Sequence, residues 1–63
     1  MNYRYYTLYR PPMPGTVPRQ GLIRVECLDD RAEIEPGIMA WGEVEYNRPL
    51  MKSEIRDYEL KPA

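Results

Sequence analysis

The chain has 63 residues, of which 43% are hydrophobic and 30% charged, and its formal net charge is −1. This length predicts one small domain, and a sequence without histidine excludes Ser-His-Asp and Cys-His catalytic systems. Cys27 is the only cysteine, which excludes an internal disulfide and a structural zinc site within one chain. No apolar run approaches the roughly 18–20 residues of a membrane span. We therefore expect a cytoplasmic protein that neither binds a cofactor or metal nor contacts a membrane.

Residues 2–10 are rich in tyrosine and predict a first β-strand. Alternation divides its side chains between two faces, with Tyr3, Tyr5, Thr7 and Tyr9 on one and Arg4, Tyr6, Leu8 and Arg10 on the other. Neither face is cleanly apolar, so the pattern leaves open which one packs inward. Pro11 ends the strand, and residues 11–18 predict a stiff proline-rich loop with a tight turn at Pro14-Gly15.

Residues 21–27 predict a second strand, because apolar and charged side chains alternate along them. Ile23, Val25 and Cys27 are expected on the core face, where Cys27 would pack as a small hydrophobic residue. Residues 28–37 are polar and are predicted as a connection that is long for a tight hairpin, so we expect it to hold a short irregular or extended piece.

Residues 38–46 predict a third strand, which contains the one tryptophan of the chain. Gly42 beside Trp41 indicates a bulge, or a large ring lying over bare backbone. We expect Trp41 to be buried, either in the core or against a second subunit.

Residues 51–59 predict a short helix, because Met51, Ile55 and Tyr58 form an apolar stripe at helical spacing and Pro62 prevents continuation. The expected fold is a small α+β domain, in which a three-stranded antiparallel sheet carries one short C-terminal helix packed on one face. Such a sheet has two open edges, so we also expect a homo-oligomer.

Charge is distributed unevenly along the chain. Residues 1–24 carry +4, residues 25–47 carry −6 and residues 48–63 carry +1. One interpretation is that basic and acidic strands lie side by side and form cross-strand ion pairs. The other is that a basic aromatic face binds nucleic acid while an acidic face binds a basic partner.

Three segments, 10–18, 40–50 and 54–60, together resemble short proteins of phages and integrative elements of Firmicutes. These proteins carry a label that relates them to defence against restriction. The most specific element is Ala-Trp-Gly at 40–42 followed by Tyr-x-Arg-Pro-Leu at 46–50. The resemblance implies a mobile-element accessory protein that antagonises or evades host defence, and it implies no catalytic residue.

The resemblance predicts a non-enzymatic protein that binds a host macromolecule, such as a restriction or CRISPR component. The predicted contact surface consists of basic and aromatic side chains, namely Tyr3, Arg4, Tyr6, Arg10, Arg24 and Trp41. The alternative is a small oligomeric protein that stacks bases on tyrosine and holds phosphate with arginine. A third hypothesis is an enzyme that uses the carboxylates of Glu43 and Glu45, which alternation places on one strand face.

Overall fold

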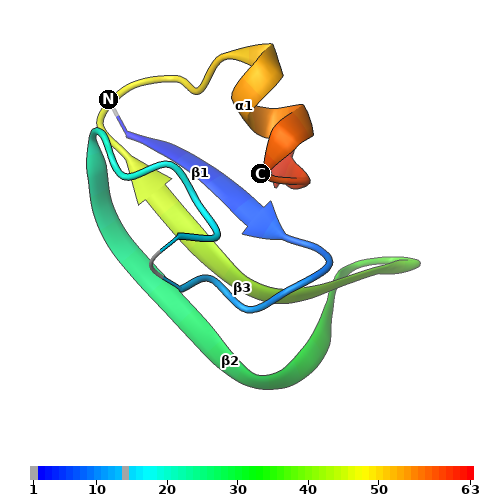
Figure 1. Cartoon of the computed structure of the whole chain (residues 1–63). Coiled ribbons are helices and arrows are strands. Elements are labelled where there is room, and N and C mark those ends of the chain that lie inside the picture. Colours follow the sequence, from blue (N-terminus) through cyan, green and yellow to red (C-terminus); the bar gives the residue numbers. More distant parts are fainter. Residues whose placement is uncertain (1, 14) are drawn as a thin grey trace.

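A computed structural model describes residues 2–13 and 15–63. In chain order, these residues form β1 (Tyr3–Thr7), β2 (Leu22–Glu35), β3 (Ile38–Tyr46), α1 (Lys52–Asp57) and β4 (Leu60–Pro62). The strands make one antiparallel sheet in the order β2-β3-β1-β4 (Figure 1). The predicted α+β class with one short helix is confirmed. The prediction of three strands is wrong, because the described residues form four.

The fourth strand was missed because it is very short and ends in proline. After α1, Glu59 takes a positive φ of 55° and reverses the chain, so that Leu60 lies opposite Thr7 and Pro62 opposite Tyr5. Proline has no N–H to donate. β4 is an edge strand, so only those of its backbone groups that face β1 need partners in the sheet, and a proline is tolerated there. Pro62 therefore does not end the helix as predicted, because α1 already ends at Asp57, and it belongs to a strand instead.

β2 continues far beyond its predicted end at residue 27 and reaches Glu35, so most of the connection predicted for residues 28–37 is strand and the piece expected within it is extended. The chain turns at Pro36-Gly37, where Gly37 has a φ of 80°. The predicted bounds of β3, residues 38–46, are confirmed. β2 pairs with β3 through three register shifts, and most of its side chains are exposed. The second half of β2 therefore lacks the alternation that would have identified it.

The core lies between one face of the sheet and a covering layer made of α1 and the loop that joins β1 to β2 (Figure 1). Its buried side chains come from the strands, the loop and the segments flanking α1: Tyr5, Val17, Val44, Tyr46, Leu50 and Leu60. Tyr3, Leu22, Ile55 and Tyr58 pack against them. The question left open for β1 is thereby answered, because Tyr3, Tyr5 and Thr7 face inward. Tyr9 lies beyond the end of β1 and is 67% exposed.

The side of β2 expected to face the core is right for Val25, which lies opposite the buried Val44, but the expected burial is wrong. Ile23 is 50% exposed, Val25 is 44% exposed and Cys27 is also exposed, whereas Leu22 packs against the core. A register shift between Leu22 and Arg24 places Leu22 opposite the fully buried Tyr46, which accounts for its inward position. Cys27 accordingly does not serve as a packed hydrophobic residue.

A ring does lie against the bare backbone of Gly42, but it is the small ring of Pro12 and not the large ring that was expected. A Cβ on Gly42 would lie 2.7 Å from Cγ and Cδ of Pro12. On the neighbouring strand, Thr7 donates its hydroxyl to the Gly42 carbonyl at 3.2 Å. The other interpretation of Gly42 was a bulge in its own strand. The irregularity lies instead in the facing strand, where β2 has a register shift between Cys27, which is opposite Gly42, and Ala32. The turn predicted at Pro14-Gly15 includes Pro14, which lies outside the described residues; Gly15 has a φ of 92°.

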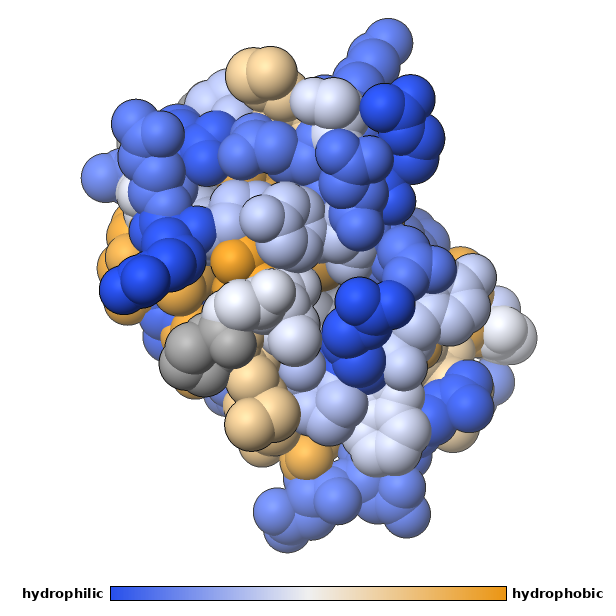
Figure 2. All heavy atoms as spheres, in the orientation of Figure 1, coloured by the Kyte–Doolittle hydropathy of each residue, from blue (hydrophilic) through white to orange (hydrophobic). Residues whose placement is uncertain are grey.

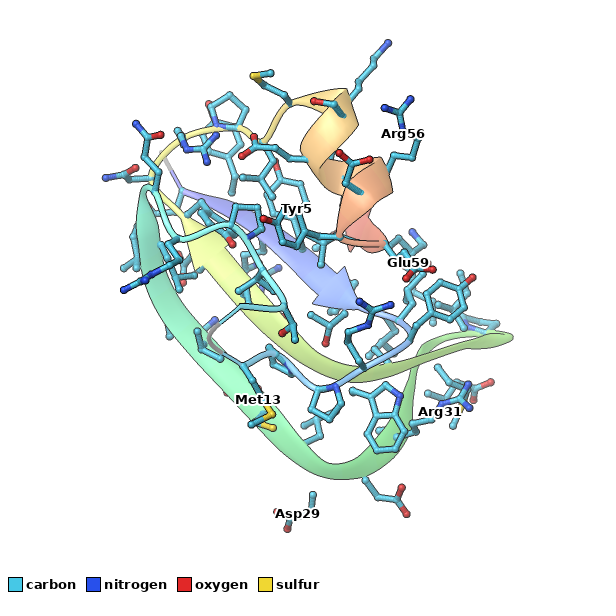
Figure 3. The ribbon with its side chains drawn as sticks, in the orientation of Figure 1. Tyr5, Met13, Asp29, Arg31, Arg56 and Glu59 are labelled. Atoms are coloured by element: carbon cyan, nitrogen blue, oxygen red, sulfur yellow. The ribbon has the colours of Figure 1, made fainter. Side chains whose placement is uncertain are left out.

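α1 is shorter than predicted at both ends. Met51 is its N-cap in an extended conformation, and the Glu54 carboxylate accepts the Met51 N–H at 2.9 Å. This contact performs half of a capping box, so the first turn is held although residue 51 is not serine or threonine. At the other end, Tyr58 is the C-cap and the positive φ of Glu59 stops the helix. In Figure 3, Arg56 and Glu59 lie at this end of the helix.

Candidate functional site

The sheet face opposite α1 is made of charged side chains, and we call it the charged face. It is formed by alternate residues of three strands: Arg4 and Tyr6 of β1, Arg24 and Glu26 of β2, and Glu43 and Glu45 of β3. The register places both Arg4 and Arg24 opposite Glu45, and both Tyr6 and Glu26 opposite Glu43. β3 runs between β1 and β2, so Glu45 has an arginine opposite it on each neighbouring strand.

Arg24 is the centre of the charged face and contacts three carboxylates. Its Nε donates to Glu45 at 3.0 Å, its Nη2 to Glu43 at 2.8 Å and its Nη1 to Glu26 at 3.3 Å. The hydrogen bond from Arg24 lowers the pKa of Glu45, and a bond from Asn2 lowers it further. The cross-strand ion pairs expected from the charge distribution are thereby confirmed.

The charged face is partly overhung by the end of the β2–β3 hairpin. Lys61 of β4 lies 3.5 Å from Glu35 near the tip of that hairpin, although β4 and β2 occupy opposite edges of the sheet. The hairpin must therefore coil across the face. Beneath it is a small hollow of about 100 Å³, lined by Tyr6, Glu26, Leu28, Ile34, Gly42 and Glu43.

The structure brings together some of the predicted contact residues and separates others. Arg4, Tyr6 and Arg24 share the charged face, and strand alternation places the partly buried Trp41 on the same side of β3 as Glu43. Trp41 is thus less buried than expected and is not a member of the core. Tyr3 lies on the opposite face, against the core.

Arg10 also lies away from the charged face. It follows β1 and forms an ion pair with Glu59 at the end of α1, on the side of the molecule where the helix packs. Arg10 was grouped with Arg4 because both belong to one predicted strand, but β1 ends at Thr7 and the alternation does not reach residue 10.

Three residues of the charged face were absent from the predicted contact surface: Glu26, Glu43 and Glu45. Alternation alone could have found them, because Glu26 shares its strand face with Arg24 and the other two occupy alternate positions of β3. The predicted surface contains only basic and aromatic residues, so it omits these three carboxylates.

Among the described residues, no group of three or more potential ligand side chains is placed to hold a metal ion. The part of the chain that the structure describes also contains no helix that is long and apolar enough to cross a membrane.

Comparison with known proteins identifies the family. The family model described as defence against restriction A C-terminal matches residues 1–63. The chain belongs to this family. No curated protein and no solved structure matches the chain. The resemblance to proteins labelled for defence against restriction is thereby confirmed, and it links this defence against restriction A C-terminal domain to antirestriction.

The Tyr-x-Arg-Pro-Leu segment, which suggested the family, holds the fold of this defence against restriction A C-terminal domain together. Tyr46 donates its hydroxyl to the carbonyl of Pro18 at 2.5 Å, and Leu50 donates its N–H to the hydroxyl of Tyr5 at 2.9 Å. Both hydrogen bonds are buried and join segments distant in sequence. This motif therefore anchors the β1–β2 loop and the entry to α1 onto the sheet.

Arg48 completes this anchor. Its Nε donates to the Gln20 carbonyl at 2.9 Å, and its two Nη atoms each donate to a Glu54 oxygen at 2.9 Å. The guanidinium also lies 5.9 Å from the centre of the Tyr46 ring. Glu54 accepts the Met51 N–H as well, and these hydrogen bonds, Arg48 first, lower the pKa of Glu54 to about 2. One ion pair thus connects the loop, the sheet and the helix.

The ion pair of Glu54 gives an expected pH dependence. A carboxyl group with a lowered folded-state pKa stabilises the fold above its ordinary pKa, here 4.5, and loses this effect as the pH falls towards 2. Glu54→Gln should therefore lower the melting temperature at neutral pH, and the difference from wild type should narrow between pH 4.5 and pH 2. Circular dichroism melts over this range measure both effects.

Asp57→Asn is a suitable control for this prediction, because Asp57 is on the same helix and its side chain is 65% exposed. We expect little change in its melting temperature at each pH. A Glu54→Gln difference that stays constant from neutral pH to pH 2 would show that ionisation of Glu54 does not stabilise the fold.

Proposed function

We propose that this domain is a non-enzymatic protein of a phage or mobile element that binds a protein of the host restriction system in the host cytoplasm. The charged face is the proposed contact surface. Hydrogen bonds from Arg24 join β2 to β3, and Arg4 of β1, whose side chain is 55% exposed, lies 3.8 Å from Glu43 at the margin of the network. Arginine and aromatic residues such as Tyr6 and Trp41 are the types that most often dominate the energy of protein interfaces.

The three-carboxylate environment of Arg24 is the observation that carries the proposal. All three nitrogens of its guanidinium are engaged by glutamates of the same chain, so Arg24 is poorly placed to hold phosphate. The charged face contains two arginines and three glutamates, an excess of negative charge that repels nucleic acid. Carboxylate oxygens also have acceptor capacity left for a partner. These features favour a protein partner that presents basic or other hydrogen-bond donor groups.

The same network supports a role without catalysis. A general acid at neutral pH needs a raised pKa, whereas the hydrogen bond from Arg24 lowers the pKa of Glu45. Glu43 accepts a hydrogen bond from the same guanidinium at 2.8 Å. The carboxylate pair considered as a catalytic site is therefore better suited to hold Arg24 in place.

A restriction assay in cells tests the proposal. Wild-type protein expressed in a restricting host should raise the plating efficiency of unmodified phage. The double variant Arg4→Glu/Glu26→Lys exchanges two exposed charges without changing the net charge, and we expect it to lose protection about tenfold or more. The matched control Arg56→Glu/Asp57→Lys makes the same exchange on α1, where the side chains are 78% and 65% exposed, and should retain protection.

Two results would contradict the proposal. One is full protection by the charged-face variant, provided that circular dichroism shows both variants to be folded. The other is retention of the purified wild-type protein on DNA alone with an affinity that falls steeply with salt, which would favour the nucleic-acid alternative.

A further inference from the structure

β2 forms one edge of the sheet, and it exposes apolar side chains, which is unusual for an edge strand. It pairs with β3 on one side, and no described strand lies on the other. Ile23 and Val25 are 50% and 44% exposed, and Cys27 is exposed. Natural edge strands commonly carry features that block pairing with another strand. An edge with exposed β-branched residues is instead a template for β-strand addition.

An apolar groove of about 390 Å³ runs beside this edge. Its walls come from the β1–β2 loop and from β2, and its lining residues are Pro12, Met13, Val17, Arg19, Leu22 and Val25. Met13 is 56% exposed and lies over β2 in Figure 3. Figure 2 shows hydrophobic atoms, coloured orange, gathered on the left side of the molecule, along which β2 runs in Figure 1. The exposed apolar surface is thus continuous from the strand edge to the loop.

The sequence of β2 from residue 22 to residue 28 is complementary to itself when two copies run antiparallel. With Val25 on the twofold axis, Val25 faces its own copy, Arg24 faces Glu26 and Ile23 faces Cys27. Leu22 and Leu28 face each other at the ends of the paired segment. Every opposed pair in this register is either apolar with apolar or basic with acidic. A twofold interface requires this kind of self-complementary surface.

The local geometry of β2 suits this register. Arg24 to Cys27 pair without interruption with Glu45 to Gly42, so the middle of the segment is a regular strand between two register shifts. Arg24 and Glu26 of one copy already form an ion pair at 3.3 Å, and their side chains are 44% and 60% exposed, so a partner strand in this register places a second such pair alongside the first. Opposite-charge pairs directly across a ladder are stabilising.

We propose that a second copy of this chain adds to β2 in antiparallel orientation, with Val25 on the twofold axis. The two sheets join into one continuous sheet of eight strands, and the charged faces of both copies lie on the same side. The apolar groove of each copy borders the new strand pair. This inference concerns the β2 edge and does not depend on the binding of a restriction protein. Glu26 belongs to both surfaces, whereas Val25→Lys changes the dimer edge and leaves the charged side chains in place.

Light scattering coupled to size exclusion tests the dimer. The wild-type chain should elute with twice the 7.5 kDa mass of one chain, and dilution should shift it towards the monomer. Val25→Lys places two positive charges together on the axis and should give a monomer at every concentration. Met51→Lys changes an apolar side chain that is 63% exposed at the start of α1, far from β2 in sequence and layer, and should remain dimeric.

Disulfide trapping tests the register. Residues directly opposed in an antiparallel ladder have Cα atoms about 4.5–5.5 Å apart, within the range of a disulfide. Val25→Cys/Cys27→Ser should therefore form a covalent dimer with oxidised glutathione, which accepts the two electrons from the paired thiols. In the wild-type chain Cys27 faces Ile23, so no covalent dimer is expected.

Three outcomes would overturn the proposal. A monomeric mass for wild type at all concentrations excludes the dimer. Dimerisation of Val25→Lys, with circular dichroism showing a native fold, excludes the β2 edge as the interface. Rapid covalent dimerisation of the wild-type chain, without that of Val25→Cys/Cys27→Ser, excludes Val25 as the residue on the axis.

Discussion

Gly42→Ala is expected to lower the free energy of unfolding by about 3 kcal/mol or more, since it forces a methyl group into a site without space. The added Cβ would lie 2.7 Å from two ring carbons of the buried Pro12 and would collide with the backbone carbonyl of Glu26. Both neighbours are rigid, so the strands or the loop must move. A domain of this size has a total stability of about 3–9 kcal/mol, and this substitution removes a large part of it.

Thermal unfolding by circular dichroism measures this effect, which corresponds to a decrease in melting temperature of about 15 °C or more. Gly15→Ala is the matched control, because Gly15 has a positive φ of 92° but no atom within 4 Å of the added Cβ. Its cost is conformational and should be about 1 kcal/mol. A Gly42→Ala variant that melts at or above the temperature of Gly15→Ala would show that Pro12 does not lie on the bare backbone.

Tyr46→Phe is expected to lower the free energy of unfolding by about 2 kcal/mol, because it leaves the carbonyl of Pro18 buried without its donor. The Tyr46 side chain is fully buried, and its ring meets that of Tyr5 edge to face at 6.0 Å. Phenylalanine keeps this ring contact and removes only the hydroxyl. The melting temperature should fall by about 10 °C.

Tyr9→Phe provides the control for the loss of a hydroxyl, because Tyr9 is 67% exposed. This variant should have the melting temperature of the wild type. An alkaline titration monitored by tyrosine absorbance gives a second measure, since burial raises the pKa of Tyr46 to about 12. A raised pKa of this group stabilises the fold below its ordinary value of 10.0 and ceases to do so as the pH rises through about 12. Equal melting temperatures of Tyr46→Phe and Tyr9→Phe would contradict the buried hydrogen bond.

The stabilising and exposed parts of the domain come from different sequence segments. Gly42, Tyr46 and Arg48 lie in the motif that suggested the family, and each makes contacts that hold the loop or the helix onto the sheet. Substitutions there are expected to act through stability. Substitutions at Arg4 and Glu26 leave these contacts untouched, which makes the charged face the better place to examine function.

The sequence predicted β3 correctly because this strand is central, with one face covered and the other open. Its buried Ala40, Val44 and Tyr46 alternate with less buried residues along the whole strand. The second half of β2 is exposed on both faces, so its charged side chains produce no alternation and indicate a loop. β4 has only three residues, and its place in the sheet depends on the left-handed turn at Glu59, a conformation rarely adopted by glutamate.

Only part of the candidate site could be predicted, because part of it follows from local sequence and the rest depends on how the strands pair. Strand alternation depends only on local sequence, so it placed Arg4 with Tyr6 on one face of β1. The neighbours of Arg24 depend on the register between β2 and β3, which a shift after Leu22 determines. No local pattern contains that register, and the saturation of Arg24 by three glutamates could therefore not be predicted.

The most direct test of the account is a titration of a purified host restriction endonuclease with the purified domain, with DNA cleavage as the readout. We expect cleavage to fall linearly and stop at a fixed ratio of domain to enzyme, because the domain acts by occupying its target. The Arg4→Glu/Glu26→Lys variant should not inhibit, so cleavage should stay at the level seen without the domain. The Arg56→Glu/Asp57→Lys variant should inhibit as the wild-type domain does. Inhibition by an amount of domain far below that of the enzyme would contradict the account, as would equal inhibition by both double variants.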